Sequence, residues 1–151
     1  MKDFEDAFKK RLLSFQENLE SYNDKNSKTI TSNEWIKKYR ILSAAFCHDV
    51  NKANELTLFY ENKSDQSGKI VSQKLNNILF SEKWDYHTVL NKIKTSSLII
   101  HGHQDPIPLW VAQKIHQKIS NSKIVTIDEC GHFPYLEQPE AFFKAINNFL
   151  N

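Results

Sequence analysis

Two short apolar segments separated by a helical pattern most constrain how this chain can fold. Residues 97–100 and 123–127 are rich in isoleucine, leucine and valine, as is typical of short buried strands. Between them, apolar residues recur at helical spacing over residues 108–119. A strand–helix–strand order of this kind predicts two parallel strands joined by a right-handed crossover.

The sequence on either side of this unit completes an α/β pattern. Pro139 begins an apolar segment that predicts a final helix up to residue 150. Upstream, the predicted helices cover residues 4–19, 34–46, 52–62 and 70–80. Thr31 and Glu34 have the spacing of a capping box at the start of the second of these helices. We therefore predict an α/β fold in which a mostly helical region precedes a two-stranded parallel sheet with open edges.

Composition excludes several classes of function. The 151 residues are 40% hydrophobic and 25% charged, with a net charge of +2, so neither nucleic acid nor an acidic membrane surface is an expected partner. The sequence contains no run of about 18 apolar residues, so it predicts no membrane-spanning helix. Cys47 and Cys130 lie far apart and match no metal or redox motif. We expect both to be free thiols and the protein to be cytoplasmic.

Two side chains suited to acid–base chemistry follow the two predicted strands. Asp105 comes after the first strand and His132 after the second. Because the carboxyl ends of neighbouring parallel strands meet at one edge of a sheet, we expect the two side chains to lie together. A carboxylate there can orient the imidazole and stabilise its protonated form. Gly102 and Gly131 are expected to allow sharp turns before these residues.

Other interpretations of the same turns are less favoured. The spacing of His101, His103 and Asp105 is also that of a metal-dependent hydrolase, since imidazole and carboxylate groups bind zinc. Cys130 lies close to His132, but neighbours on a turn usually point apart, so an incidental thiol is the preferred interpretation. Glu137 is explained as a capping residue near Pro139.

Residues 84–151 resemble the C-terminal part of the α/β-hydrolase family. Residues 101–108 (HGHQDPIP) resemble the family's acid turn, and residues 131–142 (GHFPYLEQPEAF) resemble its histidine loop. The resemblance implies that Asp105 is the acid and His132 the base of a catalytic triad. It also implies that residues 1–83 form the helical lid, which is loosely similar to that of the proline iminopeptidase branch.

The family's nucleophile motif is missing from the 151 residues. The three glycines, Gly68, Gly102 and Gly131, cannot supply the sequence G-x-S-x-G that carries the serine. We therefore expect the chain to be the C-terminal part of a serine hydrolase, made of a lid and the last two strand–helix units. We expect it to be inactive alone and to need no cofactor. The expected substrate, once the site is complemented, is a small ester or amide, including aminoacyl compounds. The expected partner is a missing N-terminal half or a self-associating copy of the chain. The alternative function is that of a non-catalytic interaction module.

Overall fold

The computed structural model describes residues 2–13, 31–57, 70–71, 73–75 and 87–151. Their elements, in chain order, are α1 (Lys2–Leu13), α3 (Ser32–Ala44), the 3-10 helix η1 (Val50–Glu55), α5 (His87–Leu90), β1 (Ser97–Gly102), α6 (Leu109–Lys118), β2 (Ser122–Ile127), α7 (Pro134–Glu137) and α8 (Pro139–Leu150). Residues 70–71 and 73–75 are also helical. The boundary predicted between residues 83 and 84 lies outside the described residues.

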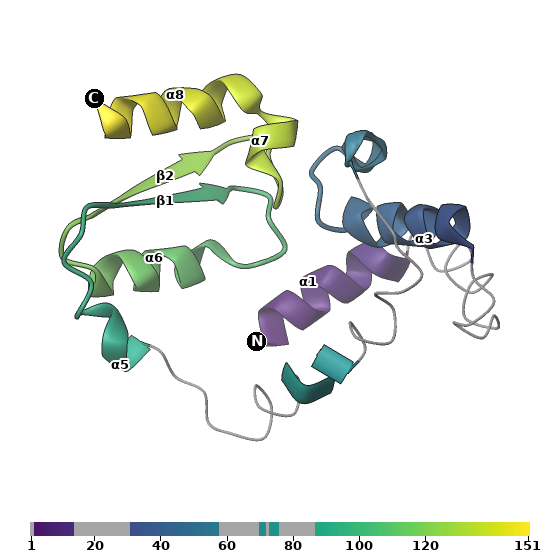
Figure 1. The fold of residues 1–151 in the computed structure, drawn as a ribbon, viewed down its shortest axis with the longest axis horizontal. Helices are drawn as coiled ribbons and strands as arrows, with labels where there is room; N and C mark the ends of the chain where they lie inside the picture. The colour runs from purple at the N-terminus through teal and green to yellow at the C-terminus, as the bar shows by residue number, and fades with distance from the viewer. Residues whose placement is uncertain (1, 14–30, 58–69, 72, 76–86) are drawn as a thin grey trace.

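The sheet has the predicted parallel topology. β1 and β2 run side by side in register, from Ser97 opposite Ser122 to Gly102 opposite Ile127. Figure 1 shows α6 against one face of the sheet and α8 against the other, which gives three layers. Both carboxyl ends point toward α7 and the helical N-terminal region (Figure 1). Within the described residues the sheet has two strands, so each strand leaves one edge without a neighbour.

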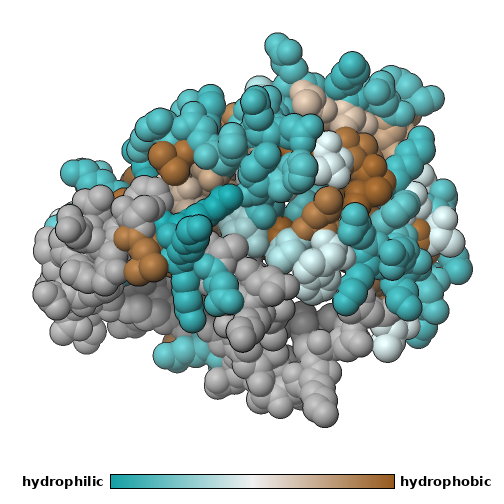
Figure 2. Space-filling model, turned by 180° about the vertical axis from the view of Figure 1, so that it is seen from behind, coloured by the Kyte–Doolittle hydropathy of each residue, from teal (hydrophilic) through white to brown (hydrophobic). Residues whose placement is uncertain are grey.

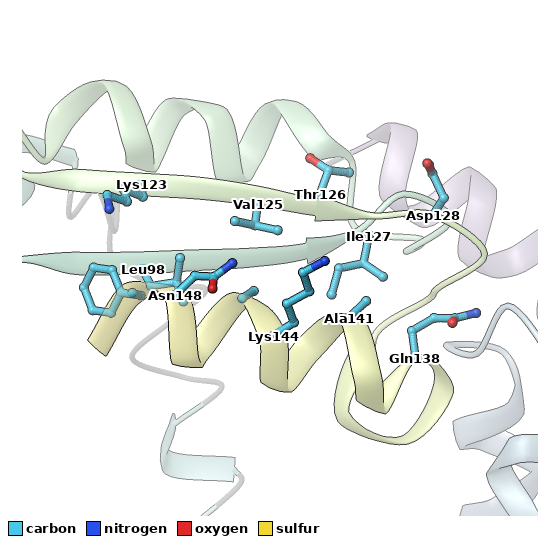
Figure 3. Close-up of a pocket in the computed structure, with 12 residues that line it drawn as sticks. Leu98, Lys123, Val125, Thr126, Ile127, Asp128, Gln138, Ala141, Lys144 and Asn148 are labelled. Carbon is cyan, nitrogen blue, oxygen red and sulfur yellow. The ribbon is translucent and has the colours of Figure 1, made fainter. Parts of the chain in front are cut away.

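An apolar groove lies between the sheet and α8. Its volume is about 500 Å³, and Leu98, Val125, Ile127 and Ala141 are among its lining residues (Figure 3). Neither Asp105 nor His132 lines it, so it is separate from the predicted acid–base pair.

The capping box of α3 is confirmed. The Thr31 side chain accepts a hydrogen bond from the Glu34 amide at 3.3 Å, and the Glu34 carboxylate accepts one from the Thr31 amide at 3.0 Å. The predicted helix over residues 52–62 is wrong for its described part, because residues Val50–Glu55 form a 3-10 helix and Leu56 is extended. Residues 58–62 lie outside the described residues. Asp49 favours this short turn, since its carboxylate accepts the Asn51 amide at 3.0 Å.

The helical region and the sheet unit share a small core. Ala44, Cys47, Ala53 and Leu56 are buried together, and Phe133, which precedes α7, and Leu136 of α7 pack against them. Arg11 of α1 extends the connection, because its guanidinium donates to the carbonyl oxygens of Ala45, Cys47 and Gln104. The loops that follow the strands are therefore held by residues from the N-terminal region.

Polar side chains cover most of the coloured surface in Figure 2, and hydrophobic ones gather over the side that carries the sheet unit. Trp110, Tyr135, Phe143 and Leu150 are among the exposed large hydrophobic residues of that unit. Among the described helices, none has the length and apolar character that crossing a bilayer requires.

Candidate active site

The two turns after the strands are joined by backbone hydrogen bonds. The amide of His103 donates to the Ile127 carbonyl at 2.8 Å, and the amide of Gln104 donates to the Cys130 carbonyl at 2.9 Å. The Gln104 side chain returns a bond, because its Oε1 accepts the Cys130 amide at 2.9 Å. Since each turn is fixed against the other, Asp105 and His132 emerge from one rigid edge of the sheet.

Glycine is required in both turns by close packing, not by unusual backbone angles. A Cβ atom on Gly102 would lie 2.0 Å from the Gly131 carbonyl oxygen, and one on Gly131 would lie 2.2 Å from the Phe46 carbonyl oxygen. Among the described residues no glycine has a positive φ; the residue that does is Glu129, at 52°. The sharp turns expected at these glycines therefore need no left-handed backbone angle, and it is the close approach of neighbouring backbone that requires glycine there.

Asp105 and His132 form the expected pair. Oδ2 of Asp105 lies 2.8 Å from Nδ1 of His132, and the other carboxylate oxygen accepts the Ile107 amide at 2.8 Å. The Asp105 side chain is 5% exposed, whereas that of His132 is 41% exposed. Because a carboxylate only accepts, Nδ1 carries the proton in this bond and Nε2 is left as the nitrogen that can take up a proton.

The pair also changes the acidity of the imidazole. The hydrogen bond with Asp105 raises the pKa of His132 above its ordinary value, and burial of the ring opposes this effect. A base whose protonated form is stabilised by a fixed carboxylate is the arrangement used in nucleophilic hydrolysis.

Aromatic rings flank the imidazole. The Phe46 ring centroid lies 5.4 Å from that of His132, and the Phe133 centroid lies 5.5 Å away in an edge-on arrangement. The His132 amide donates to the Phe46 carbonyl at 2.8 Å. The segment that follows α3 thus forms part of the wall around the imidazole.

A cavity of about 350 Å³ lies beside the pair. Asp105 and His132 line it together with mainly aliphatic residues of β1 and α6, such as Ile99 and Val111. His101 also lines it, and Nε2 of this buried side chain has no hydrogen-bond partner among the residues that the structure describes. An apolar cavity with a few polar groups at one end is typical of a small-molecule site.

The three residues of the metal alternative do not converge. Asp105 bonds with His132, whereas Nδ1 of His103 lies 2.7 Å from Asp128 Oδ1 in an exposed pair. His101 is buried at the end of β1. Among the described residues, no group of three His, Cys, Asp or Glu side chains could hold a metal ion.

Cys47 and Cys130 are free thiols, as predicted, and the structure shows that both are buried. Burial raises the pKa of each thiol to about 12, with the Glu137 carboxylate as the next contribution. The nucleophile in thiol catalysis is the thiolate, so neither side chain is suited to that role here. Among the described residues, no hydroxyl group bonds with the His132 imidazole either.

Glu137 has a role that the sequence analysis missed. It is buried and accepts backbone amides on both sides of His132, whereas the helix after it, α8, has no side-chain cap. The capping interpretation was therefore wrong. One available signal was its place directly after Leu136, in an apolar stretch where a carboxylate is unexpected.

The comparisons identify the family. The α/β-hydrolase model described as "TAP-like protein" matches residues 72–151, more than half of the chain. The chain therefore belongs to the α/β-hydrolase family. No solved structure matches.

Curated relatives match less than half of this chain. A 2-hydroxy-6-oxo-2,4-heptadienoate hydrolase of Pseudomonas putida is 34% identical over 40% of this chain and 22% of its own length. A proline iminopeptidase of Saccharolobus solfataricus is 31% identical, over 45% of this chain and 22% of its own. A pimeloyl-[acyl-carrier protein] methyl ester esterase of Nitrosomonas europaea is 36% identical over 42% of this chain and 25% of its own length. The chain thus spans about a quarter of the length of these relatives.

Proposed function

We propose that this chain is the C-terminal part of an α/β-fold serine hydrolase that cleaves an ester or amide bond. Asp105 is the triad acid, His132 is the base, and the serine belongs to polypeptide outside the 151 residues. The observation that carries the proposal is the 2.8 Å contact between a buried Asp105 and a half-exposed His132 at the carboxyl ends of parallel strands.

The chemistry follows from this geometry. Nε2 of His132 takes the proton of the serine hydroxyl as its oxygen attacks the substrate carbonyl, and Asp105 stabilises the imidazolium. The imidazolium then gives this proton to the leaving oxygen or nitrogen, which leaves an acyl-enzyme. A water molecule then attacks the acyl-enzyme while His132 takes its proton. The acyl group is released as an acid, and the serine oxygen regains a hydrogen from His132.

The relatives support a substrate with a carbonyl centre. Their printed names are those of a 2-hydroxy-6-oxo-2,4-heptadienoate hydrolase, a methyl ester esterase and a proline iminopeptidase. The cavity beside Asp105 and His132 is mainly aliphatic, so a small and largely apolar acyl group is the substrate part that we place there.

The open edge of β1 supports a role for further polypeptide. Within the described residues β1 pairs with β2 alone, and the cavity that contains the catalytic pair runs along residues of β1. An unpaired strand edge is a template for another strand. We propose that residues 1–83 act as the lid and residues 84–151 as the core part to which the nucleophile-bearing segment is added.

The test compares this chain with the same chain joined to the polypeptide encoded immediately upstream. The chain alone should not hydrolyse p-nitrophenyl acetate, whereas the extended protein should, and His132→Ala should abolish that activity. His103→Ala is the matched control, because His103 also pairs with an aspartate but does so at the exposed surface. Hydrolysis by the chain alone that His132→Ala removes, or an extended protein without any hydrolysis, would overturn the proposal.

A further inference from the structure

Glu137 is a buried carboxylate that joins two distant parts of the chain. It is the last residue of α7 and is 8% exposed. Oε1 accepts the amides of Gly131 at 2.9 Å and Phe133 at 3.4 Å. Oε2 accepts the amides of His48 and Asp49. A carboxylate can remain buried because donors of this kind replace its lost water.

The residue enclosed by these bonds is His132. Its two neighbours donate to Glu137, and its own amide donates to the Phe46 carbonyl at 2.8 Å. Three consecutive backbone amides are thus fixed, which leaves side-chain rotation as the main freedom of the imidazole. Glu137 accepts two of these amides, and the Phe46 carbonyl of the helical region accepts the third.

We propose that Glu137 is a positioning residue: it holds the loop of His132 so that Nδ1 faces Asp105, and it couples this geometry to the 46–49 segment of the helical region. The inference rests on the proposed function, in which His132 is the catalytic base. Glu137 itself touches no reacting atom.

Packing supports the coupling independently of the hydrogen bonds. Phe133 next to His132 and Leu136 of α7 pack against the buried cluster of Ala44, Cys47 and Leu56. Gly131 lies so close to the backbone of residues 46–48 that a Cβ atom on it would be 2.2 Å from the Phe46 carbonyl oxygen. The two segments are therefore in direct contact, and the Glu137 carboxylate accepts amides from both of them.

The test replaces Glu137 with Gln. An amide retains one acceptor oxygen, and its NH₂ group would face amide donors, so at least one of the two segments is released. Glu140→Gln is the matched control, because Glu140 undergoes the same charge change at an exposed position three residues away. NMR titration of the His132 ring should show a lower imidazole pKa in Glu137→Gln and no change in Glu140→Gln.

A double-mutant cycle separates positioning from a direct effect of charge. In an Asp105→Asn background, Glu137→Gln should have a smaller effect on the His132 titration, because the bond through which it acts is already lost. An equal effect in both backgrounds would overturn the proposal. Glu137→Asp keeps the charge but is one methylene shorter, so it too should lower the imidazole pKa, and it carries the test if Glu137→Gln does not fold.

These outcomes are distinguishable from a failure of the proposed function. If Asp105→Asn leaves the titration of His132 unchanged, the proposed role of Asp105 as the acid partner of His132 is refuted. If Asp105→Asn lowers the imidazole pKa and neither Glu137 variant does, the role of Glu137 alone is refuted.

Discussion

Oδ2 of Asp105 lies 2.8 Å from Nδ1 of His132, although 27 positions separate the two residues in the chain. The parallel register brings them together, because it sets Gly102 opposite Ile127 and so aligns the ends of the two strands. This pair leads to predictions about the pH dependence of stability and about turnover by the proposed hydrolase.

Asp105→Asn should lower the imidazole pKa of His132, since the bond that raises it is weakened. A raised pKa stabilises the fold below the unfolded value of about 6.5, and this contribution is lost as pH rises through the folded value. Asp105→Asn should therefore lower Tm more at about pH 5.5 than at about pH 9. Thermal unfolding at both pH values is the measurement. Asp128→Asn, at the exposed His103 pair, is the matched control; a difference in Tm between the two pH values equal to that of Asp105→Asn would contradict the assignment.

In a completed hydrolase, the same two residues should control turnover. Asp105→Asn and His132→Ala should each lower kcat by on the order of 10⁴-fold, and the double variant should be little worse than either alone, because the groups act as a unit. Steady-state kinetics with an ester substrate provide the measurement. Additive losses in the double variant would indicate that the two residues act independently.

Much of this arrangement could be predicted from the sequence. The two apolar segments determined the parallel pairing, because short buried strands around a helix have few other topologies. The turns after them placed Asp105 and His132 at one edge. The link between Thr31 and Glu34 was predictable for a similar reason, since a capping box depends on residues three positions apart.

Contacts between residues far apart in the chain could not be predicted from such local patterns. Glu137 is fixed by residues 89 and 88 positions earlier, His48 and Asp49, and nothing local in the sequence indicates those partners. The close packing at Gly102 likewise depends on where Gly131 lies in space. The 3-10 helix η1 escaped prediction because the Asp49 side chain favours a short turn over a continuing α-helix.

The two cysteines should be almost unreactive in the folded protein. Burial raises the pKa of the Cys47 and Cys130 thiols to about 12, so few thiolates exist near neutral pH. Labelling with 5,5′-dithiobis(2-nitrobenzoate) should be slow in buffer and should reach both thiols rapidly in guanidinium chloride. Rapid labelling of Cys130 in the folded state would revive its interpretation as a nucleophile.

Gly102→Ala should severely destabilise the fold. Its Cβ atom would lie 2.0 Å from the Gly131 carbonyl oxygen and 2.5 Å from that of Cys130. Both contacts are with backbone, which cannot rotate away, so the free energy of unfolding should fall by at least about 2 kcal/mol. Urea denaturation measures this change. Thr126→Ala, at an exposed position of the neighbouring strand, serves as the control and should have a small effect.

Arg11→Met should loosen the connection between α1 and the acid turn. The guanidinium donates to the carbonyl oxygens of Ala45 at 3.3 Å, Cys47 at 3.2 Å and Gln104 at 2.6 Å. Their loss should lower the free energy of unfolding by about 2–3 kcal/mol, since bonds to charged groups are strong when partly buried. Hydrogen exchange should also become faster in the acid turn. Lys10→Met, at an exposed position of the same helix, should change neither quantity.

Glu129→Gly should stabilise the protein. Glu129 has a φ of 52°, in the left-handed region where a side chain costs about 1–2 kcal/mol and glycine does not. The greater backbone freedom of glycine in the unfolded chain offsets roughly 0.5–1 kcal/mol of this, so a gain of about 0.5 kcal/mol remains. Thermal unfolding should therefore show a higher Tm. Glu140→Gly, within α8, should instead lower the free energy of unfolding by up to about 1 kcal/mol. If both variants were destabilised alike, the backbone strain assigned to Glu129 would be refuted.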